Sequence, residues 1–191
     1  MEFLTSEIDS LTIANSDNAW TESKPRNRKT KHMKEQISES HQASYSYPEY
    51  HAYVSDEVPL MSWHGNAKRS SFIHEYDTNI MGSFTCTNAR CKKNGWSSKK
   101  IAINIRYYYG NRYNAIVYNQ RCKDCNSLGS MSVDISSYTE RVAYRLNKWL
   151  GLPVETPQHS GESKGPHQKS LCEGCKAGHC SEGNTTKFWH K

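Results

Sequence analysis

The clearest hydrophobic pattern in the chain is an alternation of apolar and polar or small residues after position 98. A period of two is typical of a half-buried β-strand, so we predict a strand over residues 99–109. Its apolar positions are Ile101, Ile103 and Ile105. Gly110-Asn111 then predicts a two-residue turn of the glycine-first type, and the apolar residues after it predict a return strand over residues 112–121. The pattern therefore predicts an antiparallel β-hairpin.

A helical period begins after Ser137. Ser137 and Glu140 have the spacing of a capping box, which predicts Ser137 as the helix N-cap. Apolar residues then recur along one helix face, at Val142, Leu146, Trp149 and Leu150. Gly151 predicts the end of this helix. The other face is basic, as exposed helix faces often are, with Arg141, Arg145 and Lys148.

The first 80 residues have no sustained period of either kind. Residues 1–60 are rich in Ser, Asn, Glu and Lys, so we expect a disordered polar tail. Its basic run over residues 24–31 is typical of a solvated charge cluster, of a nuclear-import signal or of a nucleic-acid tether. Residues 61–80 predict a poorly patterned arm. Residues 81–181 are then the folded domain, and residues 182–191 a C-terminal tail.

The predicted fold class is a small α+β zinc-bound domain. It combines an antiparallel β-hairpin or ribbon with one amphipathic helix, after a long disordered N-terminal region. Only 35% of the 191 residues are hydrophobic and the mean hydropathy is −0.88, so the chain can bury one core at most. Residues 82–150 hold 12 Lys/Arg and 3 Asp/Glu, a net charge of +9, whereas residues 1–81 have a net charge of −4. The folded domain carries the basic surplus.

The N-terminus and the cysteine count both favour a reducing compartment. The first residues contain acids where a signal peptide has its basic segment, and no continuous apolar segment follows. No apolar run approaches the ~20 residues that cross a bilayer. Seven cysteines, an odd number, also disfavour a framework of disulfides. We therefore expect a soluble intracellular protein, cytoplasmic or nuclear, with thiols available for metal.

The cysteines and one histidine form a set of eight candidate metal ligands. The cysteines are Cys86, Cys91, Cys122, Cys125, Cys172, Cys175 and Cys180, and the histidine is His167 or His179. Two of the pairs have CxxC spacing, in which both sulfurs can face one ion. Thiolates with one imidazole suit Zn²⁺, and eight ligands fill two tetrahedral sites. We predict two Zn²⁺ ions per chain.

Two divisions of the eight ligands remain open. In the local division, Cys86, Cys91, Cys122 and Cys125 form one site at the base of the hairpin, and the histidine and the last three cysteines form the other. Loop-closure entropy favours this arrangement. In the crossed division, Cys172 and Cys175 join Cys86 and Cys91, which would tie the C-terminal segment to the hairpin.

Four segments of the chain resemble the 3CxxC-type zinc-finger family, which includes the receptor-transporting proteins, the zygote arrest proteins and many fungal members. They are residues 82–86, 96–98, 119–125 and, most specifically, the sequence GPHQKSLCEGCKAGHC at 165–180. The resemblance covers about residues 80–180. It implies ligand roles for His167, Cys172, Cys175 and Cys180 and for Cys122 and Cys125. The first pair departs from it, since Cys86 and Cys91 have four residues between them instead of two.

Closed four-ligand sites are structural, because a catalytic zinc needs an open position for water. We therefore expect a non-enzymatic binding or adaptor module. Its partner is either RNA, as the zygote arrest relatives imply, or a protein client, as the receptor-transporting relatives imply by escorting membrane receptors. The candidate nucleic-acid contacts are cations and aromatics of the hairpin, namely Lys99, Lys100, Arg106, Tyr108, Arg112 and Tyr113.

Overall fold

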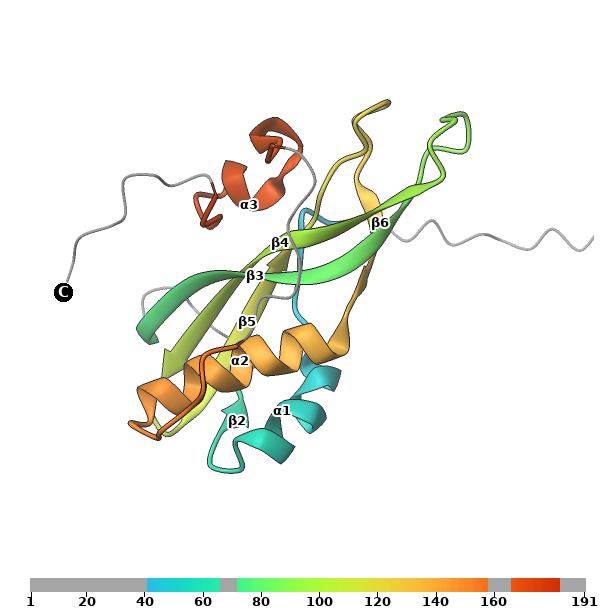
Figure 1. Ribbon diagram of the computed structural model, residues 1–191. Helices are drawn as coiled ribbons and strands as arrows, with labels where there is room; N and C mark the ends of the chain where they lie inside the picture. Colours follow the sequence, from blue (N-terminus) through green and yellow to red (C-terminus); the bar gives the residue numbers. More distant parts are fainter. Residues whose placement is uncertain (1–40, 66–71, 158–165, 183–191) are drawn as a thin grey trace, which may run out of the picture. The chain divides into compact units, whose positions relative to one another are not determined.

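The computed structural model describes residues 41–65, 72–157 and 166–182 (Figure 1). The strands are β1 Ser44–Tyr45, β2 Ser62–Trp63, β3 Phe72–Cys86, β4 Gly95–Tyr108, β5 Arg112–Tyr118 and β6 Gly129–Val133. The α-helices are α1 His51–Glu57, α2 Ile135–Trp149 and α3 Glu173–Lys176. Two short 3₁₀ helices cover Pro48–Tyr50 and Lys169–Leu171. The predicted basic run at 24–31 and most of the predicted C-terminal tail lie outside the described residues.

The strands form one six-stranded sheet in the order β1-β5-β4-β3-β6, with β2 beside β5. All pairs are antiparallel except the short parallel pair β2–β5. The long strands β3 and β4 pair over most of their length and dominate Figure 1. The predicted α+β class, with its hairpin and amphipathic helix, is confirmed. The sheet is larger than a hairpin because β3 and β6 extend it on the far side of β4.

The predicted hairpin is β4–β5, with Tyr107 opposite Tyr113. Its turn differs from the glycine-first type, because Gly110 (φ 75°) and Asn111 (φ 51°) both have positive φ, as in a type I′ turn. The return strand ends at Tyr118 rather than at residue 121. Beyond it the backbone of Asn119 bonds to other segments, since its amide donates to Ala43 O and its carbonyl accepts from Glu173 N.

Helix α2 covers one face of the sheet, and the main core lies between them. Val142 and Leu146 of the helix are fully buried against the strand isoleucines that alternate along β4. The predicted N-cap is wrong by three residues. Asp134 caps the helix, because its side chain accepts a hydrogen bond from Ser137 N at 2.8 Å. Ser137 is instead buried in the first turn, where its Oγ accepts a bond from Met81 N.

Two segments expected to be disordered or poorly patterned are ordered parts of this domain. Residues 41–57 include α1, whose Val54 is fully buried, and a Tyr47–Tyr50 stack with ring centroids 4.8 Å apart. Residues 72–80 are the first part of strand β3. Both interpretations failed for the same reason: these apolar residues pack against partners that are distant in sequence, which a local pattern does not reveal. Tyr50, for example, packs edge-on against Tyr138 of α2.

The other face of the sheet carries the C-terminal segment. Ala102 and Tyr118 point to this face and form a second small core with Cys172 and Cys180. A side chain on Gly174 would collide with the Cβ of Ala102, so the backbone of α3 lies directly on the sheet. The sheet is therefore covered by a helix on one face and by residues 166–182 on the other.

Candidate metal centres

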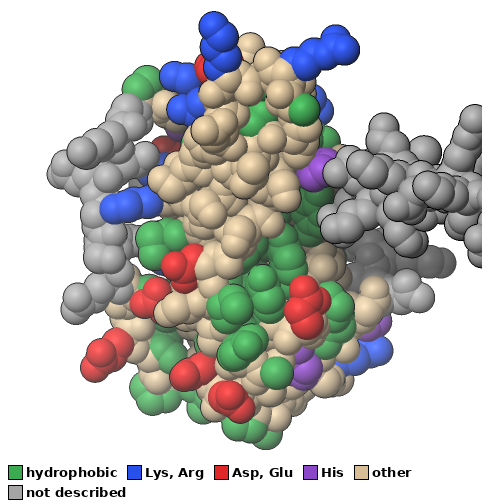
Figure 2. Space-filling view, turned by 90° about the vertical axis from the view of Figure 1, so that its right-hand side faces the viewer, with side chains coloured by type: hydrophobic (Ala, Val, Ile, Leu, Met, Phe, Trp, Pro, Cys, Tyr) green, Lys and Arg blue, Asp and Glu red, His purple; other side chains and the backbone are tan. Residues whose placement is uncertain are grey.

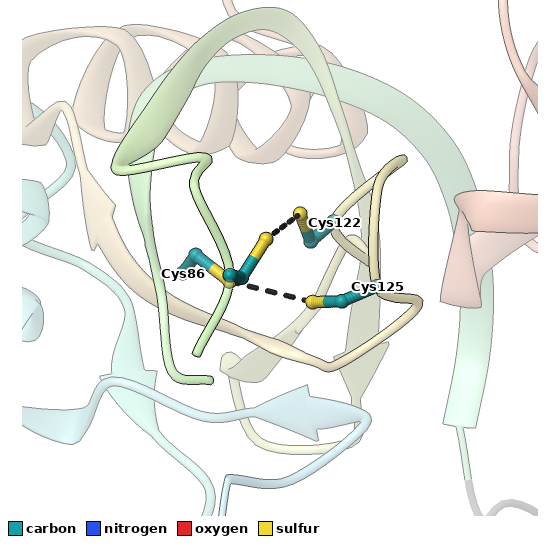
Figure 3. A group of neighbouring side chains, drawn as sticks. Cys86, Cys122 and Cys125 are labelled. Atoms are coloured by element: carbon teal, nitrogen blue, oxygen red, sulfur yellow. Dashed lines mark hydrogen bonds between the residues drawn. The ribbon is translucent and has the colours of Figure 1, made fainter. Parts of the chain in front are cut away.

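The first candidate centre brings together Cys86, Cys91, Cys122 and Cys125, whose sulfurs all lie within 4.8 Å of one another. Cys86 ends β3, and Cys122 and Cys125 lie in the turn between β5 and β6. These segments meet because β6 pairs with β3, which sets Cys86 opposite Gly129. In Figure 3 the side chain of Cys86 points toward those of Cys122 and Cys125.

Short loops hold the four sulfurs in place. After Cys86, the chain folds back so that the Cys86 amide donates to Asn94 O. Within that loop Asn88 accepts two bonds, from Cys91 N at its carbonyl and from Arg90 N at its side chain. The enlarged spacing of the first cysteine pair is therefore accommodated by a closed loop, and Cys91 reaches the other three sulfurs. In the second loop, the Cys122 amide donates to Ser127 O.

The sulfur separations fit a tetrahedral zinc ion. Ligands at ~2.3 Å from zinc in a tetrahedron are about 3.8 Å apart. Cys86 Sγ lies 3.5 Å from Cys125 Sγ, and Cys91 Sγ lies 3.8 Å from Cys122 Sγ. All four cysteines are free thiols. The donor set and its spacing suit Zn²⁺ in a closed site.

The second candidate centre consists of His167, Cys172, Cys175 and Cys180. His167 Nε2 lies 3.2 Å from Cys175 Sγ and 3.5 Å from Cys180 Sγ. A nitrogen at ~2.0–2.1 Å and a sulfur at ~2.3 Å from one tetrahedral zinc would be about 3.5 Å apart. Cys172 and Cys180 are buried, so this centre is more enclosed than the first. Its donors, three thiolates and one imidazole, again suit zinc.

The structure places His167 in this group and His179 outside it. His179 is buried, stacks on the ring of Tyr118 and lies with its Nδ1 3.0 Å from Asp77 Oδ1. It therefore ties the second centre to β3 and leaves the ligand position to His167. The eight residues are grouped as in the local division, because the first four along the sequence form one centre and the last four form the other.

Although the ligands divide locally, the second centre is attached to the sheet. Gln120 and Cys172 form an isolated antiparallel bridge, and the Arg121 amide donates to Leu171 O. Glu173 lies 2.5 Å from the guanidinium of Arg121 and 2.7 Å from the ammonium of Lys176. The contacts of Gln120 and Arg121 join the C-terminal segment to the residues that directly precede Cys122, so the two centres are adjacent in the fold.

The thiols within each group differ in pKa, so a bound cation would favour ionisation of the whole group. Hydrogen bonds from the hydroxyl and amide of Ser127 lower the pKa of Cys125 to about 6. The backbone amide of Asn88 lowers the pKa of Cys86, but burial and the three neighbouring thiols outweigh it and raise that pKa to about 12. Contact with the Cys172 thiol lowers the pKa of Cys180 to about 5. One thiolate forms readily in each group, and further ones require a compensating positive charge.

Zinc affinity should therefore rise steeply with pH. At pH 7 Cys125 is ionised in the metal-free first centre, whereas Cys86 and Cys91 have raised pKa values and keep their protons. Zinc must displace at least these two protons, so the logarithm of the affinity should increase by at least about 2 per pH unit near neutrality, and acid should release the metal. Zinc titrations against a competing chelator between pH 6 and 8 would measure this slope. A pH-independent affinity would contradict the assignment of thiolate ligands.

Three of the six predicted nucleic-acid contacts are wrong because their side chains are buried. Tyr108 and Tyr113 lie at 1% and 0% exposure. Arg106 is 6% exposed, and its Nε lies 3.2 Å from Glu75 Oε1 on the neighbouring strand. Lys99 and Arg112 are exposed, while Lys100 is half-buried and pairs with Glu182 at 2.9 Å.

A cavity of about 260 Å³ lies next to the second centre, between β4 and the turn that holds Cys122. Four of its lining side chains are cationic, namely Lys93, Lys100, Arg121 and Lys123, and none is acidic. Trp96 also lines it, stacked on Phe84 and donating through Nε1 to Gln120 Oε1 at 3.3 Å. Of the lining residues, Lys93, Arg121, Lys123 and Gln120 were not among the predicted candidate contacts. Their closeness to metal ligands in sequence is the signal that could have identified them.

No helix among the described residues is long and apolar enough to cross a membrane. Comparisons with curated proteins and with solved structures gave no match. The comparison with protein families matches residues 79–178 to the 3CxxC zinc ribbon, described as a zinc-binding domain. This match covers just over half of the chain and contains every candidate ligand except Cys180. The resemblance seen in the sequence is thus confirmed, and the chain belongs to the 3CxxC zinc-ribbon family of zinc-binding domains.

Proposed function

We propose that the chain is a non-enzymatic module that binds single-stranded RNA through the basic surface around its zinc centres. The observation that carries this proposal is the cavity beside the second centre, where four cations and an indole ring converge without an acidic side chain. Cations that contact phosphates beside aromatic rings that stack on bases are the usual means of holding single strands.

The two centres support a structural role for zinc. Each has four protein donors, so neither leaves a coordination position for water or substrate. Zinc in such a site contributes folding free energy, and here it would fix the loops that carry the cations. The partner would then contact the side chains of the binding surface and would not coordinate the zinc ions.

The cations of this surface differ in how free they are to bind phosphate. Arg121 and Lys100 already pair with Glu173 and Glu182. Lys93 and Lys123 form no ion pair with any residue that the structure describes. Lys and Arg side chains gather in the upper part of Figure 2, where Figure 1 places the β3–β4 loop. These unpaired lysines are the strongest candidates for phosphate contacts.

Reversing both charges in a Lys93→Glu/Lys123→Glu variant should weaken binding to a labelled single-stranded RNA of mixed sequence. Two lost phosphate contacts should reduce the slope of log K against log salt by about 1.4. Fluorescence anisotropy at several salt concentrations would measure both effects. Lys148→Glu, an exposed position at the end of α2, is the matched control and should leave binding unchanged.

Two outcomes would contradict the proposal. The first is that the wild-type protein, with both zinc ions bound, binds no RNA even at low salt, where phosphate contacts are strongest. The second is that Lys148→Glu weakens binding as much as the double variant, which would indicate attraction to net charge rather than to this surface.

A further inference from the structure

A second surface lies on the helical side of the domain and shares no residue with the basic cavity. It is a groove of about 770 Å³ between α1, α2 and the segment 154–157. Two hydrophobic side chains are unusually exposed there, Tyr53 at 49% on α1 and Ile135 at 37% at the start of α2. Thr139 also lines it, and its Oγ1 is buried without a hydrogen-bond partner among the described residues.

The charge of the groove is opposite to that of the cavity near the zinc centres. Its lining contains four carboxylates and neither lysine nor arginine. The acids are Asp56, Glu57, Glu140 and Glu155. Within the described residues, none of them forms an ion pair. In the lower part of Figure 2, below the basic end, acidic side chains surround exposed hydrophobic ones.

We propose that this groove binds a basic, partly apolar peptide segment of a partner protein. Four unpaired carboxylates around one hollow repel each other, and lysines or arginines of a partner would relieve that repulsion and speed the encounter. Tyr53 and Ile135 stand on different walls, so aliphatic side chains of the same segment could be buried between them. The acids would repel RNA and anionic lipid surfaces, which makes the groove selective.

The chemistry of the groove defines what the peptide must contain. Charge alone would leave Tyr53 and Ile135 exposed to water, and apolar contact alone would leave the carboxylates unpaired. A segment that alternates Lys or Arg with Leu would pair with the carboxylates and also bury the two hydrophobic side chains. A purely basic or a purely apolar segment would do only one of these. Because the RNA surface and the groove have no residue in common, the domain could hold both partners at once.

The test uses the full chain with zinc bound and a fluorescently labelled peptide composed of lysine, arginine and leucine. We expect saturable binding by anisotropy, and at least a tenfold loss of affinity in an Asp56→Lys/Glu140→Lys variant. Glu49→Lys is the matched control, because Glu49 is an exposed acid close to α1 that does not line the groove. Unchanged zinc content and circular dichroism would show that each variant is folded.

Two further peptides probe the proposed chemistry. Peptides in which glutamate replaces the basic residues, or serine replaces leucine, should each bind at least tenfold more weakly. Equal binding of either peptide would overturn the proposal, and so would full affinity in the Asp56→Lys/Glu140→Lys variant. Sedimentation should show a monomer that does not change on peptide addition. If the protein instead self-associates, and the Asp56→Lys/Glu140→Lys substitutions abolish that association, then the groove binds a second copy of the chain. That result would contradict the proposed binding of a peptide.

Discussion

Replacing Cys122 by serine should reduce the zinc content of the purified protein from two ions to one and unfold the sheet near the first centre. Cys122 is fully buried, and its centre joins the end of β3 to the turn before β6. Apparent binding free energies of structural zinc are about 10–16 kcal/mol, comparable with the roughly 5–15 kcal/mol that stabilises a whole domain. Native mass spectrometry would count the ions, and near-ultraviolet circular dichroism would report the packing of the aromatic core.

A matched control for this variant lies in the same loop region. Thr87 directly follows Cys86, and its exposed hydroxyl donates to Leu128 O. Thr87→Ala removes that bond without removing a ligand, so it should retain two zinc ions and the wild-type spectrum. A Cys122→Ser protein that still binds two ions would exclude the proposed first centre.

The Cys172→Ser variant should have a different and more limited effect. All ligands of the second centre lie between His167 and Cys180, so the variant should lose one zinc ion and the amide protection of residues 166–182. The β4–β5 hairpin shares no ligand with this centre, although it would lose the packing of the second small core. It should therefore keep its slow exchange, at a somewhat lower stability.

Hydrogen exchange followed by mass spectrometry would test this expectation. Lys176→Ala, which removes an ion pair with Glu173 but no ligand, is the control and should retain protection in both regions. Loss of protection throughout β4 and β5 in Cys172→Ser alone would indicate that the two centres fold as one unit.

Local signals were enough to predict β4, β5, most of α2 and the seven cysteines that the structure gathers into two candidate centres. Each depends on spacing between near neighbours: alternation for Ile101 to Ile105, helical repeats for Val142 and Leu146, and short intervals between cysteines. The N-cap was misplaced because Ser137 and Glu140 satisfy the capping-box pattern, whereas Asp134, the observed cap, has no Glu or Gln three residues later. In the structure Ser137 lies in the first turn of the helix, where its amide donates to Asp134 and its Oγ accepts a bond from the amide of Met81.

The parts that were missed depend on contacts between distant residues. Arg106 was expected to contact RNA because it is one of the cations that alternate with aromatic residues in the basic hairpin. Its partner Glu75 lies 31 positions away on β3, a strand that the sequence had not predicted. Likewise, Tyr108 and Tyr113 are aromatic residues of a hairpin that could have been exposed, and only the packing around them shows that they are buried.

The spacing of ligands along the chain has a consequence for how the protein matures. The second centre closes a short stretch, with 13 positions between His167 and Cys180, whereas the first must bring together Cys86 and Cys125, 39 positions apart. The shorter loop loses about 1 kcal/mol less chain entropy on closing. During synthesis, however, Cys125 leaves the ribosome well before His167. The easier loop to close is therefore synthesised last, after Ala102 and Tyr118, the residues of the sheet on which it packs.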